Sequence, residues 1–421
     1  MLPILASLAA VSNKKRMNLL VLSWKNLVSR PLSLLLSLLL FSLGVGLISF
    51  LLLLTRQLEE KFSKNLADID LVIGAKGSPL QLILSAMYHV DAPTGNIPLD
   101  EAAPFMNPKH PLIKKAVPLS LGDSYKGYRI VGTTPAFLDL YPHEIAEGKI
   151  WENDLEAVIG ADVAKKLGLK LGDKFRSSHG LIMDDSLDLE HEGDFTIVGI
   201  LKPSGSVLDQ LLLCNTATIW KIHETPHEHE TESDHEHSES KEITALLVQF
   251  RGKNYQALNL QRNINENTNL QAASPAWEMN RLYENIGVGE QALQILALII
   301  ILVSGLSVFI SLYSSLRERK YELALIRVMG ASRGALFLLI ILEGLLIAVL
   351  GYLAGIIFSH AAMELLSGAL QKAYRYTFSG GIFLKEEWWL LAGAVFIGLM
   401  AAVLPALQAQ RTDISQTLSE G

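Results

Sequence analysis

The stretch that begins at His223, HETPHEHETESDHEHSES, is rich in side chains that bind metal ions or move protons. Its first five residues match the H-E-x-x-H pattern of zinc peptidases, in which two histidines on one helical face bind zinc and the glutamate is a general base. Pro226 lies between those histidines, where it would cost a helix about 3 kcal/mol or more. We therefore assign no catalytic residue and rank a membrane metallopeptidase lowest among the candidate functions.

A second interpretation of the same stretch is a metal-chelating loop over residues 223–240. Histidine alternates there with glutamate and aspartate, and both ligand types suit Zn²⁺, Cu²⁺ and Ni²⁺. The affinity should be modest, because ordering a loop costs conformational entropy. The predicted zinc ligands are His223, His227, His229, His235 and His237. The alternative is a hydrophilic insertion between two strands, in which the histidines are incidental.

Four long apolar runs determine on which side of a membrane this stretch lies. Half of the 421 residues are hydrophobic, and the mean hydropathy is positive. Each run reaches the ~20 residues that a helix needs to cross a bilayer, where a helix or closed barrel alone satisfies its own backbone. The predicted transmembrane helices cover residues 32–54, 291–316, 335–359 and 388–406.

Lysine and arginine predict the orientation of these helices, because they favour the cytoplasmic side. They gather before the first helix and between the second and third: Lys14, Lys15, Arg16, Lys25 and Arg30, then Arg317, Arg319, Lys320, Arg327 and Arg333. We expect residues 1–31 and 407–421 to be cytoplasmic, and 55–276 and the loop 360–387 to lie outside. The opening MLPILASLAAVS has no basic residue before its apolar part, so we interpret it as a short tail, with Met17 an alternative start.

The region 55–276 predicts a mixed domain of strands and helices. Short β-rich runs occur at 128–131, 157–159, 195–198 and 245–248, and a helix over Asp162–Leu167 should end at Gly168. Residues 70–98 predict a strand that turns into an amphipathic helix. The single cysteine, Cys214, excludes an intrachain disulfide, so the domain must depend on its core. The fold class is thus an α-helical membrane protein with four transmembrane helices and a large mixed α+β extracytoplasmic domain between helices 1 and 2.

Residues 317–334 predict a short amphipathic helix on the cytoplasmic side, ended by Gly330. Tyr321, Leu325 and Val328 share one face at helical spacing, and charged residues lie elsewhere. Such a helix either rests on lipid headgroups or docks into a soluble partner. In the following span, Glu343 would be costly in lipid, so we expect it to face another helix or the partner. The third span also contains Gly351-x-x-x-Gly355, a pattern of close helix packing.

The order R-x-R-x-x-E-L-A-x-x-R-x-x-G-A-S from Arg317 resembles the FtsX-like permease family of ABC systems, which includes MacB and the lipoprotein-releasing permeases. The resemblance continues in WKNL from Trp24, in Pro405-Ala406 and in RTDI from Arg411. Between the first two spans, IVGTTPAF from residue 130, VIGADVAKKLGLKLGD from 158 and FTIVGIL from 195 are similar to that family's periplasmic core domain.

This resemblance implies mechanotransmission, in which a separate cytoplasmic ATPase drives the spans through the short helix and moves the periplasmic domain. The chain lacks a Walker A sequence, so it is expected to be no enzyme and to rely on a partner ATPase. The second span would continue outward as a stalk, together covering 277–316. The residues expected to couple to the ATPase are Glu318, Arg319, Glu322, Arg327 and Gly330; the alternative is that their charges form a solvated face.

The resemblance further implies a permease in a bacterial inner membrane, paired with a second copy or a paralogue. A periplasmic or lipoprotein partner is expected, and no nucleic acid. The function would be extracytoplasmic metal handling, in which zinc binds the histidine-rich loop, or export of lipoproteins or small molecules. The alternative function is an FtsX-like regulator of an envelope enzyme without transport.

Overall fold

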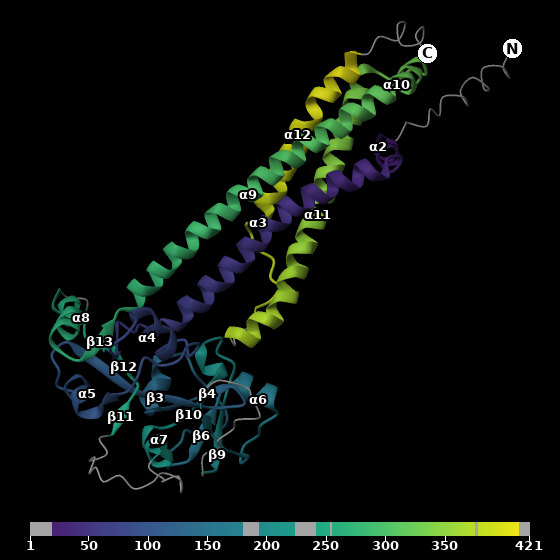
Figure 1. Cartoon of the computed structure of the whole chain (residues 1–421). Coiled ribbons are helices and arrows are strands. Elements are labelled where there is room, and N and C mark those ends of the chain that lie inside the picture. The colour runs from purple at the N-terminus through teal and green to yellow at the C-terminus, as the bar shows by residue number, and fades with distance from the viewer. Residues whose placement is uncertain (1–18, 180–192, 224–240, 253–254, 375–377, 412–421) are drawn as a thin grey trace, which may run out of the picture. The chain divides into compact units, whose positions relative to one another are not determined.

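The computed structural model describes residues 19–179, 193–223, 241–252, 255–374 and 378–411. Contacts within the chain separate two compact units. The sheet unit takes Leu58–Gly287, and the helical unit takes the parts of the chain on either side of it. Figure 1 labels the elements of both units.

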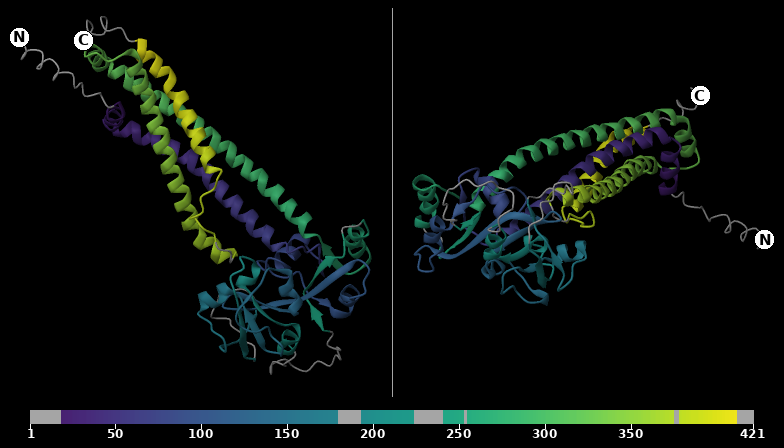
Figure 2. Two further views of the ribbon diagram at one scale, coloured as in Figure 1. Left: turned by 180° about the vertical axis from the view of Figure 1, so that it is seen from behind. Right: turned by 60° about the horizontal axis from the view of Figure 1, so that its bottom comes forward.

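The helical unit is built from α3 (Pro31–Asn65), α9 (Pro275–Glu318), α11 (Arg333–Tyr374) and α12 (Glu387–Arg411). In the described part of the chain these are the four helices long and apolar enough to cross a membrane. They run side by side in both views of Figure 2, and the short helices α2 (Leu19–Val28) and α10 (Lys320–Val328) lie at one end of them. Four candidate spanning helices at the predicted places agree with the predicted fold class.

The helices extend beyond the predicted spans. α3 continues to Asn65, and α9 begins at Pro275, so the predicted stalk is helical and continuous with the second span. The largest difference concerns residues 360–387, which we expected to be a loop, whereas α11 continues to Tyr374. Hydropathy falls after Ser359 because polar residues appear there, but those residues still favour a helix.

Glycine allows α3 and α11 to pack backbone against backbone. A Cβ placed on Gly355 would lie 2.9 Å from the Ser42 carbonyl oxygen and 3.0 Å from the Gly46 nitrogen. A Cβ on Gly351 would lie 2.9 Å from the ring of Phe41. The predicted close-packing role of the Gly351-x-x-x-Gly355 pattern is therefore confirmed by these contacts.

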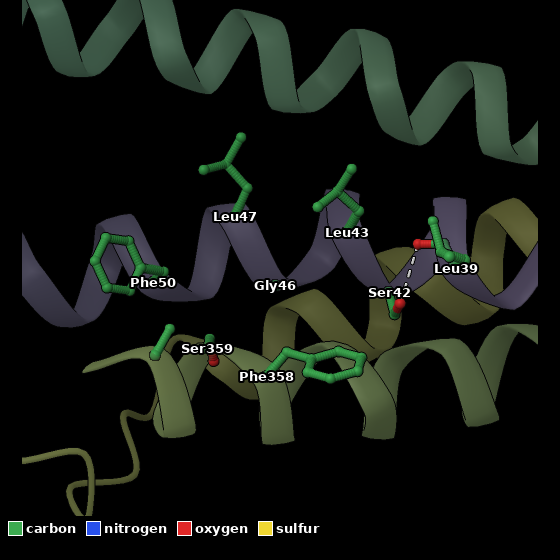
Figure 3. A pocket seen from close by; sticks show the side chains of 9 residues that line it. Leu39, Ser42, Leu43, Gly46, Leu47, Phe50, Phe358 and Ser359 are labelled. Atoms are coloured by element: carbon green, nitrogen blue, oxygen red, sulfur yellow. Dashed lines mark hydrogen bonds between the residues drawn. The ribbon is translucent and has the colours of Figure 1, made fainter. Parts of the chain in front are cut away.

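An apolar groove of about 390 Å³ runs beside this contact, where α3 lies along α11 (Figure 3). It is lined by Leu39, Ser42, Leu43, Gly46, Leu47, Phe50, Phe358, Ser359 and Ala362. The serine hydroxyls donate to carbonyl oxygens of their own helices, Ser42 to Leu39 and Ser359 to Ile356. Both hydroxyls thus have hydrogen-bond acceptors, and the groove presents mainly apolar surface.

Within the described residues, the sheet unit contains a mixed sheet of eleven strands in the order β13-β1-β12-β3-β4-β10-β6-β9-β5, with β7 paired to β9 and β8 to β3. The strands are β1 (Leu71–Ala75), β3 (Ile113–Tyr125), β4 (Tyr128–Thr133), β5 (Ile145–Gly148), β6 (Glu156–Ile159), β7 (Lys174–Phe175), β8 (Ser178–His179), β9 (Phe195–Leu201), β10 (Leu212–Asn215), β12 (Ala245–Phe250) and β13 (Leu270–Ala273). A separate pair joins β2 (Ile97–Pro98) to β11 (Glu242–Ile243). β4 with β10 and β6 with β9 are the parallel pairs among these.

The long strand β3 joins two hydrophobic cores. Its first half pairs with β12, and its second half pairs with β4. One core lies around β4, β6, β9 and β10, where the rings of Phe175 and Phe195 stack at 4.9 Å. The other lies around β1, β12 and β13 and includes Ile264. The helices of this unit are α4 (Pro79–Ala86), α5 (Leu99–Met106), α6 (Ala161–Leu167), α7 (Thr216–His223) and α8 (Tyr255–Asn267), with 3-10 turns at Pro135–Leu140 and Val207–Gln210.

The local predictions for this unit are confirmed. All four predicted strand runs lie in β4, β6, β9 and β12, and residues 70–98 form β1 followed by α4. α6 ends at Gly168, whose φ of 68° is the left-handed conformation of a helix C-cap. The predicted α+β composition of the inserted domain is therefore present.

Replacing Gly355 with alanine tests the contact between α3 and α11. Because the new methyl group would overlap backbone atoms, Gly355→Ala should lower the free energy of unfolding by about 1–3 kcal/mol. The matched control is Gly393→Ala in α12, where an added Cβ meets nothing within 4 Å, and which should change stability by about 0.5 kcal/mol or less. Thermal unfolding of the purified protein in detergent measures both. Equal losses in the two variants would contradict close backbone packing at Gly355.

Candidate functional site

The short helix α10 packs against the ends of α2, α9 and α11. Leu27, Leu316, Leu323 and Leu336 are buried in one hydrophobic cluster there. Leu323 and Ala324 form the inner side of α10, with 2% and 0% of their surface exposed. Apolar contact therefore holds α10 in a fixed orientation against its neighbours.

A buried polar network crosses this cluster and is centred on Glu343 of α11. The Glu343 side chain is 1% exposed, and its Oε1 accepts a hydrogen bond from Asn26 Nδ2 at 2.8 Å. Arg319 Nη1 lies 3.7 Å from the same oxygen, and Arg319 also donates through Nη2 to Asn26 Oδ1. Each of the three side chains thus contacts the other two. The expectation that Glu343 faces another helix is confirmed.

Arg319 occupies the break between α9 and α10. Its backbone, with φ −104° and ψ 15°, interrupts the helix that we expected to run from Arg317 to Met329. Its Nε forms an ion pair with Glu322 Oε2 at 3.0 Å. Glu318, the residue before Arg319, pairs with Arg30 at 2.6 Å. Hydrogen bonds and ion pairs therefore connect the start of α3, the end of α9, α10, α2 and α11.

Gly330 ends α10 as the sequence predicts. Its φ of 99° is in the left-handed region that favours glycine. The amide of Gly330 donates to the Arg327 carbonyl at 2.9 Å, and the amide of Ala331 donates to the Ile326 carbonyl at 3.2 Å. These two bonds form a Schellman motif. The chain then turns and enters α11, where the Ser332 hydroxyl accepts from the Ala335 amide at 3.2 Å.

The outer side of α10 is apolar, and none of the described residues covers it. Tyr321, Leu325, Val328 and Met329 have 53%, 46%, 60% and 73% of their surface exposed. Three of them are the residues that the sequence places on one helical face. Exposed apolar patches are typical of interaction surfaces, so this face of α10 is the candidate functional site.

Of the five predicted coupling residues, four lie at the surface, exposed or half-buried, and the fifth, Arg319, points inward. Glu318 and Glu322 have exposed side chains, at 63% and 64%, although each forms an ion pair. Arg327 is half-buried, and Gly330 is exposed at the turn. Arg319 differs from our expectation of a charge available for docking, because its side chain is 13% exposed and points into the network.

Sequence reasoning missed Asn26 and Arg30 as parts of this site. Both belong to the segment from Trp24 to Arg30 that carries the family resemblance before the first span. The available signal was that an asparagine and an arginine lie next to an apolar run, which indicates that they need polar partners. That pattern does not identify Glu343 and Glu318 as those partners.

Of the predicted metal ligands, His223 lies within the described residues and the other four lie outside them. His223 ends α7, and its Nε2 is 3.3 Å from Asp123 Oδ2. The hydrogen bond to Asp123 raises the pKa of His223 above its ordinary value, although partial burial acts in the opposite direction. Among the described residues, no group of three or more histidine, cysteine, aspartate or glutamate side chains is arranged to hold a metal ion.

Two other histidines of the sheet unit have structural surroundings. His110 Nδ1 accepts hydrogen bonds from the amides of Leu112 and Ile113, at 3.3 and 3.2 Å. His89 is buried against Phe137, and burial, with the nearby charge of Arg129, lowers its pKa to about 3. His89 is therefore neutral at ordinary pH.

The inward position of Arg319 predicts a difference between two arginines on the same stretch of chain. Arg319→Met leaves Glu343 buried without its cation and should cost about 3–5 kcal/mol of stability. Arg317→Met makes the same substitution at an exposed position and should cost about 0.5 kcal/mol or less. Thermal or denaturant unfolding of the two variants gives the comparison. If both behave like the unmodified protein, Arg319 does not hold the network together.

Comparison with known proteins gives two family matches and one relative. Residues 34–257 match the MacB-like periplasmic core domain, which is more than half of the chain, and residues 294–412 match the C-terminal region of FtsX-like permeases. An uncharacterized ABC transporter permease protein of Mycobacterium tuberculosis (strain ATCC 25618 / H37Rv) is 24% identical over an alignment of 318 residues, which covers 71% of this chain. The match covers 34% of that protein, so this chain spans about a third of its length.

The two matched regions together contain elements of both units. The first contains most of α3 and most of the sheet, and the second contains most of the spanning part of α9 together with α10, α11 and α12. This multi-pass membrane protein belongs to the FtsX-like ABC transporter permeases that carry a MacB-like periplasmic core domain.

Proposed function

We propose that this chain is the membrane subunit of an ATP-driven ABC system and that α10 is the surface on which a separate cytoplasmic ATPase docks. The observation that carries this proposal is the exposed apolar face of α10, on a helix whose opposite side is buried. The proposed orientation puts α10 and both termini in the cytoplasm and the sheet unit in the periplasm of a bacterial inner membrane, in agreement with the distribution of lysine and arginine.

The chemistry of the outer face of α10 suits a protein partner. Tyr321 and Met329 are of residue types that are enriched at the centre of protein interfaces, and Leu325 and Val328 add exposed apolar contact area beside them. Glu318 and Glu322 are exposed at its edge. In this proposal the apolar residues supply most of the binding energy, and the edge charges set the orientation of the ATPase.

The proposed path of force from the ATPase begins at Arg319. A push on α10 acts on α9 through the covalent junction at Arg319, and on α11 through the Arg319–Glu343 pair. Asn26 passes the same displacement to α2. Because α9 is one uninterrupted helix from Pro275 to Glu318, it is the proposed stalk that carries motion to the sheet unit.

The remaining partners and the cargo are part of the same proposal. A second copy or a paralogue completes the permease, and a periplasmic or lipoprotein partner receives the motion. The cargo classes proposed are metal ions, lipoproteins and small molecules. An FtsX-like regulator of an envelope enzyme would use the same ATPase contact, so a transport assay must distinguish it from a transporter. If the protein is such a regulator, membrane vesicles containing the complex would hydrolyse ATP without moving any cargo.

The apolar face of α10 is tested with the double variant Leu325→Ser, Val328→Ser. Removing two exposed apolar side chains from the centre of an interface should weaken association with the ATPase by about tenfold or more. The measurement is affinity purification of the permease from native membranes, with quantitative mass spectrometry of proteins that carry a Walker A sequence, and the ATPase activity of the purified complex. Glu322→Lys should lower association as well.

The matched control is Leu407→Ser, because Leu407 is also a partly exposed leucine and lies on α12. It should leave association and ATPase activity unchanged. Retained association in the double variant, with normal membrane insertion, would rule out α10 as the docking surface.

We further propose that the histidine-rich stretch binds zinc with modest affinity. Replacing His223, His227, His229, His235 and His237 together with alanine should abolish zinc binding by the full-length protein, measured by titration with zinc chloride. His143→Ala, outside the stretch, is the control and should bind as the unmodified protein does. Unchanged binding in the five-histidine variant would leave the stretch as a hydrophilic insertion.

A further inference from the structure

The short helix α2 has its polar residues on the inner side and its apolar residues on the outer side. Ser23, Asn26 and Leu27 are its buried residues. The Ser23 hydroxyl is within hydrogen-bond distance of the Leu339 carbonyl oxygen, at 3.3 Å, and Asn26 Nδ2 donates to Glu343 at 2.8 Å. These contacts fix which side of α2 faces the other helices of the unit.

The opposite side of α2 is an apolar stripe. It is formed by Leu20, Val21, Trp24 and Val28, which have 55%, 48%, 48% and 48% of their surface exposed. At 3.6 residues per turn, these four positions fall within about 100° of the helix circumference. Lys25 lies at the edge of the stripe and is exposed. A stripe of this width is typical of a helix whose apolar side meets apolar surroundings.

α2 is apolar but too short to cross a bilayer. Its 10 residues extend about 15 Å at 1.5 Å per residue, which is half of the ~30 Å thickness of the hydrocarbon layer. An apolar segment of this length is typically a helix of a protein core or a segment that enters or lies on the membrane. The exposed stripe argues against a core helix within the described part of the chain.

α2 lies next to the point where the first candidate spanning helix begins. It ends at Val28, and α3 begins at Pro31, where proline can start a helix but not continue one. α2 lies at the end of α3 and does not continue its line (Figure 1). Directly after the junction, Leu32 and Leu35 are 81% and 63% exposed. Exposed apolar surface therefore continues from α2 into α3, and a bilayer that surrounds α3 would reach α2.

The residue types on the outer side of α2 suit the headgroup region of a phospholipid bilayer. Tryptophan is enriched at membrane–water interfaces, because its ring is apolar and its N–H is polar. The carbon chain of Lys25 can lie along apolar surface while its ammonium group reaches a phosphate. The exposed face of α10 differs, since Glu318 and Glu322 at its edge would be repelled by phosphate groups.

We propose that α2 is an interfacial helix, which lies in the headgroup region of the bilayer with its apolar stripe toward the acyl chains and Lys25 toward the phosphates. Through Asn26, α2 then connects the membrane surface to the network around Glu343. This proposal goes beyond the proposed function and does not rest on it, because a permease whose α10 binds no ATPase would still have α2 in the membrane.

Spin labelling of the full-length protein in phospholipid nanodiscs tests the proposal. A nitroxide is attached to the cysteine of Val21→Cys. Power saturation measures its collisions with O₂, which dissolves in lipid, and with a water-soluble nickel chelate. Cys214 is 0% exposed, so the introduced cysteine should be the one that reacts. The unmodified protein, treated in parallel, should give no signal.

Two exposed leucines, each replaced by cysteine, are the references for lipid and for water. Leu353 lies in the apolar part of α11 and Leu171 lies in the sheet unit, and they are 49% and 46% exposed. The label at Val21 should collide often with O₂, as the label at Leu353 does. It should lose most of the collisions with the nickel chelate that the label at Leu171 shows. Leu20→Cys, on the same stripe, should give the same result.

Frequent collisions of the labels at Val21 and Leu20 with the nickel chelate would show that the stripe lies in water and would overturn the proposal. Rare collisions with both reagents would show that protein covers the stripe, such as a second copy of this chain, and would overturn it as well. If one of the two variants does not fold, the other decides, since both positions lie on the stripe.

Discussion

The cost of placing a carboxylate among apolar helices is the constraint on which the helical unit depends. A buried carboxylate must have hydrogen-bond partners, and an apolar surrounding offers none. Glu343 obtains its partners from α2 and from the α9–α10 junction, and Glu387 obtains its own from α3 and α11. Apolar contact has no direction, whereas these bonds do. The two acids therefore specify which helices are neighbours at each end.

The sequence predicts most of the elements because their signals are local. Apolar runs of sufficient length predict the spanning helices, and alternating β-rich runs predict the strands that form β4, β6, β9 and β12. The ends of the helices are harder to predict from the sequence, because a helix that leaves the apolar layer keeps its backbone hydrogen bonds while its hydropathy falls. α11 illustrates this, because it continues through His360 to Tyr374.

The features of the candidate site that have local signals are likewise predicted from the sequence. The apolar face of α10 and the turn at Gly330 follow from spacing and residue type. The inward position of Arg319 does not, because it depends on Asn26 and Glu343, which are 317 residues apart in the chain. A single sequence indicates that Glu343 needs a partner but not which one. His223 is similar: its contact with Asp123 joins residues that no local pattern connects.

The close approach of Gly46 and Gly355 has a mechanical consequence. Where two helices touch backbone to backbone, as at Gly46 and Gly355, a rotation of one helix on the other would pivot about that contact. Along α11, Glu343 is about 18 Å from Gly355 and His360 about 8 Å, at 1.5 Å of rise per residue. The two arms of this lever are unequal. A rotation of α11 on α3 would move the Glu343 end roughly twice as far as the His360 end, with a correspondingly larger force at the shorter arm.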